Sequence, residues 1–318
     1  MELQNVLKQG LRRLLTPVRN WLVKIIDERH AALSATQMLL LGQIRLKQLE
    51  NESPENLQKS EIKIFSQGGE DGIIQKMLQF LPNIPCRFVE FGVQNYLEAN
   101  TRFLVLNNHW DGLILDGSQA NIDLIKTQEI YWQKALIARN VFITKDNIQS
   151  ILSEEGFDQN LGLLSIDIDG NDYWIWQTIK SQPWIVVCEY NSWFGPDKRY
   201  SIPYQEEFNR STAHYSNLFF GASIQALCSL AEEKGYVLVG ADSMGTNVFF
   251  VRRDMAYAFK ACGPHDVYVQ SPIRQARDAN GRLTFLNYDE GRRLMGALLV
   301  YDFDLQRCVR FDEAEGLR

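Results

Sequence analysis

Strand and helix patterns alternate through the middle of this chain, and the alternation restricts the folds that it can adopt. Apolar runs typical of strands lie at 87–93, 112–116, 136–144, 161–168 and 184–190, and helical patterns follow them at 97–108, 119–128, 147–155, 173–180 and 222–234. Five successive β–α units predict a doubly wound α/β fold with a parallel sheet. Two further strand patterns, 236–241 and 247–252, are separated by a loop of hairpin length, so the last strand should run antiparallel.

Acidic side chains follow two of these apolar runs directly. The run at 161–168 leads into Asp167 and Asp169, and the run at 184–190 leads into Glu189. In open α/β sheets ligands bind outside the carboxyl ends of the strands, and the tips of neighbouring strands lie ~5 Å apart. Carboxylates that close repel one another unless a positive group lies between them or one of them holds a proton. We therefore expect the chemistry of the protein at these two tips.

Residues 1–60 are predicted to form an amphipathic helical extension and a linker. Apolar residues recur at helical spacing from Leu3 to Ile26, with a break at Pro17, and basic residues outnumber acidic ones over residues 1–24. A basic amphipathic helix can lie on an anionic membrane surface, or it can pack on the domain or on a second subunit of a homo-oligomer. Residues 51–60 are polar, contain Pro54 and are typical of a linker.

The core domain is predicted at 61–255, and residues 256–318 are predicted to be an appendage of the same domain. Arginines cluster in this appendage around the turn signal Asn280-Gly281. One interpretation is a helix and hairpin that finish the core. The other is a lid whose arginines bind an anionic or phosphorylated substrate. The arginines are Arg274, Arg277, Arg282, Arg292 and Arg293.

Composition narrows the classes of partner and compartment. The net charge of −6 argues against a general nucleic-acid binder. The five cysteines are scattered without a CxxC pair, which indicates reduced thiols in a cytoplasmic protein. The sequence has no stretch of eighteen apolar residues, so we expect no transmembrane helix in it. It has no small-residue cleavage site of the kind that follows a secretory signal.

The ends of the first two strand patterns favour a nucleoside ligand. Glu90 and Gly92 end the first pattern, where a glycine lets the chain turn tightly under a ligand, and Asp116 ends the second, where an acid can accept both ribose hydroxyls. The alternative for Asp116 is a turn or helix cap shared with Ser118. A dinucleotide requires three glycines around its pyrophosphate, and only one is present. S-adenosylmethionine carries no phosphate and does not require them.

These segments resemble the FkbM-type S-adenosylmethionine-dependent methyltransferases. The similar segments are Phe65–Asp71, Phe88–Gly92, Asn100-Thr101, Leu113–Gly117 and Ser165–Asp172, in order across residues 62 to about 255. The resemblance implies a class I methyltransferase fold, with seven strands in the order 3-2-1-4-5-7-6. It also implies O-methylation, commonly of sugars in polysaccharides or secondary metabolites.

The same resemblance implies a cofactor site. Gln94 and Tyr96 stand where the motif has its second and third glycines, which leaves the path of that loop open. Glu90 and Gly92 would lie near the methionine part and Asp116 at the ribose. The full set of expected cofactor residues is Ser66, Gln67, Glu90, Gly92, Asn100, Thr101, Asp116, Ser118 and Asp167.

A divalent metal is a further expectation. The Asp169-Gly170-Asn171 segment is similar to the Asp-Gly-Asp of metal-dependent sugar O-methyltransferases, which hold Mg²⁺ between the fourth and fifth strand tips. The matching groups here are Asp169, then Glu189 or Asn191. A metal would lower the pKa of a substrate hydroxyl and orient it for attack. The alternative is structural, with a cap for the next helix and an ion pair between Glu189 and a basic side chain.

Methylation of a hydroxyl also requires a base. The candidates are His214, which lies in the long insertion after the fifth strand, and the tip acids Asp169 and Asp167. Aromatic residues of the insertion suit stacking on a sugar or closure over the cofactor. They are Tyr190, Trp193, Phe194, Tyr200, Tyr204 and Phe208.

Three functions remain open from the sequence. The first is an S-adenosylmethionine-dependent O-methyltransferase acting on a sugar, polysaccharide or glycosylated metabolite, with or without Mg²⁺. The second is a nicotinamide-dependent sugar oxidoreductase, against which the missing glycines and the closing hairpin count. The third is a non-catalytic cofactor-binding scaffold at a membrane surface, against which the clustered acids count, because buried charge without a use is costly.

Overall fold

The computed structural model describes residues 16, 33–49 and 56–316 and divides the chain into two compact units, Met1–Gln48 and Leu49–Arg318. In the first unit residues 33–48 are helical, and Leu40, Leu41 and Ile44 are exposed on this helix. Apart from residue 16, the basic segment 1–24 lies outside the described residues, and so do residues 51–55 of the predicted linker. None of the helices in the described ranges is long and apolar enough to cross a membrane.

The second unit is built on a seven-stranded sheet in the order β3-β2-β1-β4-β5-β8-β7. Strands β1 to β5 are mutually parallel where they pair, and β8 runs antiparallel to both of its neighbours. Without the short β6, which belongs to another sheet, this is the predicted order with a reversed last strand, so the predicted fold is confirmed. The strands are β1 (Arg87–Phe91), β2 (Asp111–Asp116), β3 (Leu136–Asn140), β4 (Leu163–Ile166), β5 (Ile185–Glu189), β7 (Tyr236–Ala241) and β8 (Asn247–Arg252).

Helices cover both faces of this sheet because side chains alternate along its strands. Leu113 of β2 faces one apolar layer and Ile114 faces the other. One layer contains α5 (Ile148–Glu154), α6 (Asp172–Thr178) and α8 (Ile224–Glu233). The other contains α2 (Glu70–Gln79), α3 (Gln119–Thr127), α4 (Glu129–Gln133), the 3-10 turn η1 (Leu57–Ser60) and the π-helical turn η2 (Leu104–Asn108).

The predicted helix at 97–108 is present only over residues 102–108, so its predicted start is wrong. Regular helical structure begins at Arg102, and only Leu104–Asn108 form a described helical element. The amides of Asn100 and Thr101 instead donate to the buried carboxylate of Glu90 at 2.8 and 3.1 Å. Because those N–H groups are directed at a side chain, residues 97–101 form bends rather than the first turns of a helix.

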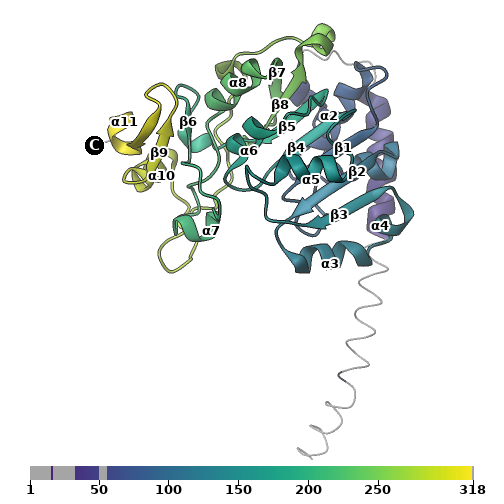
Figure 1. Ribbon diagram of the computed structural model, residues 1–318, viewed down its shortest axis with the longest axis horizontal. Coiled ribbons are helices and arrows are strands. Elements are labelled where there is room, and N and C mark those ends of the chain that lie inside the picture. The colour runs from purple at the N-terminus through teal and green to yellow at the C-terminus, as the bar shows by residue number, and fades with distance from the viewer. Residues whose placement is uncertain (1–15, 17–32, 50–55, 317–318) are drawn as a thin grey trace, which may run out of the picture. The chain divides into compact units, whose positions relative to one another are not determined.

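The C-terminal residues pack with the insertion after β5 to form a second, smaller core (Figure 1). A three-stranded sheet in the order β10-β9-β6 carries this part, on the opposite side of Figure 1 from α3 and α4. Tyr200, Phe194 and Phe311 meet edge to face at its centre. Its elements are β6 (Tyr200–Ser201), β9 (Leu299–Asp302), β10 (Arg307–Arg310), α10 (Tyr288–Met295) and α11 (Phe311–Glu315), and the insertion also holds η3 (Ser192–Phe194) and α7 (Arg210–Ala213). The connection after β8 holds η4 (Arg253–Ala258) and α9 (Pro264–Val267), which pack on the layers of the large sheet.

The appendage arginines serve this packing and its surface. Arg292 pairs with Glu315 between α10 and α11, and its guanidinium lies over Tyr288 at 5.3 Å. Arg274 donates to a backbone carbonyl of the neighbouring turn. These arginines therefore serve the smaller core and its surface, whereas Ser271, Ile273 and Gln275 of the same segment line a cavity.

Candidate functional site

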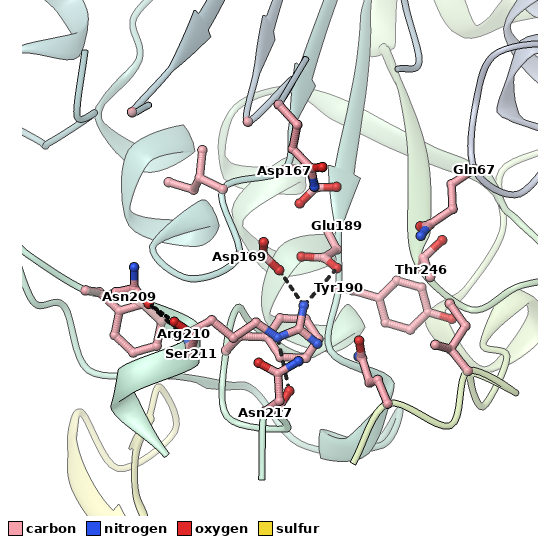
Figure 2. Close-up of a pocket in the computed structure, with 18 of the residues that line it drawn as sticks. Gln67, Asp167, Asp169, Glu189, Tyr190, Asn209, Arg210, Ser211, Asn217 and Thr246 are labelled. Atoms are coloured by element: carbon pink, nitrogen blue, oxygen red, sulfur yellow. Dashed lines mark hydrogen bonds and ion pairs between the residues drawn. The ribbon is translucent and has the colours of Figure 1, made fainter. Parts of the chain in front are cut away.

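A cavity of about 770 Å³ opens at the carboxyl ends of β1, β2, β4 and β5 (Figure 2). Gly92, Asp116, Asp167 and Glu189, one from each strand end, all line it. A smaller recess of about 170 Å³ adjoins it and shares its lining at Gly92, Asp116 and Asp167. Because the parallel strands end at one edge of the sheet, residues far apart in the sequence converge here, as the sequence predicts.

Gly92 forms the floor of the cavity. Its backbone φ is +73°, and a Cβ atom built on it would lie 1.7 Å from the carbonyl oxygen of Asp167. The ends of β1 and β4 therefore approach each other as closely as they do only because residue 92 is glycine. Because Gly92 has no side chain, the cavity above it is left free for a ligand.

The loop after Gly92 keeps a glycine-like backbone without glycines. Gln94 has φ +48° and Tyr96 has φ +60°, at the two positions where the family motif has glycine. The Tyr96 hydroxyl contacts Thr101 Oγ1 at 2.9 Å, and the Gln94 amide donates to Asp116 Oδ2 at 2.7 Å. These contacts hold the left-handed conformations, which cost free energy in non-glycine residues.

Asp116 lines the cavity, and the protein already uses most of its hydrogen-bonding capacity. Oδ2 accepts from Gln94, and Oδ1 accepts from the Ser118 amide at 2.8 Å and from Asn121 Nδ2 at 3.0 Å. The expected cap is therefore real, and Ser118 also caps α3 through Asn121. A carboxylate has about four acceptor positions, so one remains for a ribose hydroxyl. The ribose role stays a prediction.

Four expected cofactor residues lie behind the cavity wall rather than on it. Glu90 accepts from the Asn100 and Thr101 amides and from Thr101 Oγ1, and Asn100 Nδ2 donates to Ser165 Oγ. Burial raises the pKa of Glu90 to about 7. Glu90, Asn100 and Thr101 are not among the lining residues of either cavity, and their polar atoms hold the β1 loop, so their contact with a cofactor stays a prediction.

Ser66 has the same supporting role, whereas Gln67 reaches the cavity. Ser66 Oγ accepts from the Asp71 amide, and Asp71 Oδ2 accepts from the Ile64, Phe65 and Ser66 amides. This network fixes the loop before α2 and leaves Gln67 on the cavity lining. Gln67 lines the cavity and Ser66 does not, and a role for either in cofactor binding stays a prediction.

Three acids meet at the β4 and β5 tips. Oxygen atoms of Asp167, Asp169 and Glu189 all lie within 4.8 Å of one another. Asp169 has φ +55°, and the Asp172 carboxylate holds this turn by accepting from the Ile168 and Gly170 amides at 2.8 and 2.9 Å. The sequence correctly predicts a cluster of carboxylates at this position.

Burial makes two of these acids hard to ionise. It raises the pKa of Asp167 and of Glu189 well above the usual range, and the negative charge of each neighbouring acid raises both further. Glu189 Oε2 is buried without a hydrogen-bond donor. One proton held by Asp167 or Glu189 relieves the repulsion between them.

Arg210 is the positive group between the acids (Figure 2). Its Nη1 is ion-paired with Asp169 Oδ1 and lies 4.0 Å from Glu189 Oε1. The Arg210 guanidinium lies over the Phe220 ring at 3.5 Å, and Nε donates to the Asn217 carbonyl at 3.0 Å. The structural alternative for Glu189, proximity to a basic side chain, is thus present, and the sequence does not identify Arg210.

His214 and Asn191 are misassigned as site residues. His214 does not line either cavity, and its Nδ1 contacts Ser216 Oγ at 2.7 Å. Asn191 is fully buried, donates from Nδ2 to the Leu218 and Phe220 carbonyls and accepts from the Trp193 amide. The amide of Asn191 is therefore used to shape the insertion and does not face a metal between β4 and β5.

Aromatic side chains form part of the cavity lining. Trp193 lines it and stacks on Tyr288, and Phe208 covers Gly170 closely. Phe194 and Tyr200 belong to the smaller core, and the Tyr204 hydroxyl accepts from the Lys145 amide. Lining residues that the sequence did not predict as site residues include Gln94, Asn121, Phe142, Asn209, Arg210, Ser211, Asn217, Phe220, Thr246, Ser271, Ile273 and Gln275.

No protein-family model matches the chain, and a search of curated proteins finds no match. Among solved structures it is similar to the N-terminal domain of EvdMO1 with SAH bound, at 11% identity and TM-score 0.40 over 66% of this chain and 94% of that one. The O-methyltransferase from Bacillus cereus in complex with SAH is 12% identical with a TM-score of 0.36, and the match covers 68% of this chain and 88% of that one. A putative sarcosine dimethylglycine methyltransferase from Galdieria sulphuraria is 12% identical with a TM-score of 0.35, and the match covers 54% of this chain and 62% of that one.

Likenesses this weak do not identify a function, and they do not single out the FkbM family. The function has to be inferred from the cavity itself.

Proposed function

We propose that this protein is an S-adenosylmethionine-dependent O-methyltransferase whose acceptor is a neutral, hydroxyl-rich molecule such as a sugar or a glycosylated metabolite. The observation that carries the proposal is the single cavity that runs from Gly92 and Asp116 to the acids Asp167, Asp169 and Glu189. A nucleoside sulfonium lying across the first two strand tips would direct its methyl group toward those acids.

The charge of the cavity supports a cationic cofactor. Four acids line it, and Arg210 is the only basic side chain among the described lining residues. Like charges repel in a partly buried site, so a pyrophosphate is poorly matched to this lining and a sulfonium is well matched. This argument disfavours a nicotinamide dinucleotide.

The lining also supports a neutral acceptor. Beyond the acids, the cavity presents amide and hydroxyl side chains, among them Asn209, Ser211, Asn217 and Gln275, together with the aromatic rings already described. None of the appendage arginines lines either cavity. A sugar offers hydroxyls to the amides and an apolar face to a ring, whereas a phosphorylated substrate would lack a free cation here.

In the proposed reaction Asp169 is the base. Its side chain is half exposed to the cavity and is oriented by Arg210. The acceptor oxygen attacks the methyl carbon in line as the carbon–sulfur bond breaks, the hydroxyl proton passes to the Asp169 carboxylate, and neutral S-adenosylhomocysteine leaves. The protein contributes alignment and exclusion of water, which supply much of the acceleration in displacement reactions.

A divalent metal does not fit the cluster as the structure holds it. The oxygen donors of Asp167, Asp169 and Glu189 suit Mg²⁺ chemically. However, the Arg210 guanidinium contacts Asp169 and lies near Glu189, so a dication placed among the same oxygens would meet a fixed positive charge. We therefore derive the reaction without a metal.

Substitution of Asp169 tests the proposal. In Asp169→Asn we expect kcat for methyl transfer from labelled S-adenosylmethionine to a panel of glycosides to fall about 10²–10⁴-fold, the usual contribution of a general base. The cofactor Kd measured by calorimetry should change less than threefold. Asp123→Asn, on the exposed face of α3, is the matched control. Binding of NAD in preference to S-adenosylmethionine, or full turnover in Asp169→Asn, would contradict it.

A further inference from the structure

We propose that the Arg210 guanidinium is the resident cation of the Asp167–Asp169–Glu189 cluster, that it takes the place of a divalent ion, and that removing it converts the cluster into a metal site. The part of this proposal that concerns turnover rests on the proposed function. The part that concerns metal binding does not.

The position of the guanidinium is the first argument. Oxygen atoms of the three acids lie within 4.8 Å of one another, a separation that one small cation can bridge. Arg210 Nη1 is ion-paired with Asp169 and lies 4.0 Å from Glu189, and Figure 2 shows it directed at both. A cation therefore already occupies the mouth of the cluster.

The way Arg210 is held is the second argument. Phe220 supports the flat face of the guanidinium, the Asn217 carbonyl binds Nε, and Nη2 is buried without a hydrogen-bond partner. The Arg210 side chain is only 11% exposed, whereas the surface arginines Arg199 and Arg310 that pair with acids are 36% and 49% exposed. Arg210 is thus fixed by Phe220 and the Asn217 carbonyl in addition to its ion pair with Asp169.

Charge balance is the third argument. Three carboxylates carry up to three negative charges, and the guanidinium offsets one of them. The cluster therefore still presents net negative charge to a sulfonium. A dication added beside the guanidinium would cancel that negative charge, which would weaken the attraction for the cofactor.

Arg210 is consequently a positioning residue. It holds the Asp169 carboxylate toward the cavity, where the strained φ of Asp169 already presents it. Without the guanidinium, the three acids would repel one another and would provide the oxygen ligands that Mg²⁺ and Mn²⁺ prefer.

Metal binding to the full-length chain tests the proposal directly. Mn²⁺ is titrated into the protein, and the free ion is followed by electron paramagnetic resonance. We expect the unsubstituted protein to show no stoichiometric Mn²⁺ binding up to roughly millimolar free ion. We expect Arg210→Ala to bind one ion per chain with a Kd at least tenfold below that concentration. Adding Asp169→Asn to Arg210→Ala should remove that binding.

Two further variants control for folding and for the loss of any arginine. Arg210→Gln retains a stem that can pack on Phe220 and should also gain the metal. Arg252→Ala removes an arginine that is paired with Asp254 and stacked on Trp184 away from the cavity, and it should gain none. Stoichiometric Mn²⁺ binding by the unsubstituted protein, or none in a folded Arg210→Gln variant, would overturn the proposal.

Turnover provides the second readout. Methyl transfer by the unsubstituted protein should be unchanged in EDTA. Transfer by Arg210→Ala should fall at least 100-fold and recover at least tenfold when Mn²⁺ is added. If no acceptor is methylated by any variant, the proposed function fails while the metal titration still decides the role of Arg210. Loss of activity in EDTA by the unsubstituted protein would overturn the proposal.

Discussion

Substitution of Gly92 by alanine should separate the backbone requirement of the site from ordinary loss of stability. The new Cβ would lie 1.7 Å from the Asp167 carbonyl oxygen, and the φ of +73° is unfavourable for alanine. The left-handed conformation costs about 1–2 kcal/mol and the steric overlap about 1–3 kcal/mol more. We therefore expect the free energy of unfolding to fall by about 2–5 kcal/mol and the β1 and β4 tips to move apart.

Gly156→Ala is the matched control for this prediction. Gly156 has φ +69°, and nothing lies within 4 Å of a Cβ built on it, so this variant carries only the conformational cost. The entropic effect of Gly→Ala on the unfolded chain is common to both variants and cancels in the comparison. Urea denaturation gives the free energies of unfolding, and calorimetry gives cofactor affinity.

Gly92→Ala should bind S-adenosylmethionine at least tenfold more weakly than Gly156→Ala. Equal stability of the two variants, with equal cofactor binding, would refute the close packing of β1 on β4 as the floor of the site.

Three other substitutions test the assignments made in the site. His214→Ala should leave kcat within threefold, because the imidazole lies outside the cavity, and a loss of 100-fold or more in steady-state assays would restore His214 as the base. The pKa of Glu90 is raised to about 7, so its proton stabilises the fold fully below pH 4.5 and that stabilisation is lost as the pH rises through 7. Relative to Glu90→Gln, the unsubstituted protein should therefore lose roughly 3 kcal/mol of unfolding free energy between pH 4.5 and 8 in urea titrations, and parallel pH profiles would show that Glu90 is ionised throughout. Asn191→Ala should lower the free energy of unfolding by about 2–4 kcal/mol, because two buried carbonyls lose their donor, and a variant of unchanged stability with no turnover would return Asn191 to the site.

The fold and the acid cluster were predictable because local sequence determines them. Apolar runs that end in acids mark buried parallel strands and their tips, so Asp167 and Glu189 could be placed together without coordinates. The closing hairpin similarly determined the reversed strand. These features depend on residues close together in the chain and on general rules of sheet topology.

Arg210 could not be identified in the same way. The repulsion between the acids predicted a cation, but Arg210 lies in an irregular insertion without periodicity, and its position depends on Phe220 and Asn217. Glu90 shows the converse case. Its place at a strand tip was correct, but its carboxylate turns to the backbone of residues 100 and 101, which no sequence pattern reveals.

A crystal structure of the full chain with S-adenosylhomocysteine would test the central claim most directly. We expect one molecule per chain above Gly92, with its ribose at Asp116 and its sulfur directed toward Asp169. Ligand density elsewhere on the protein, or above Gly92 with the sulfur turned away from the acids, would contradict the account.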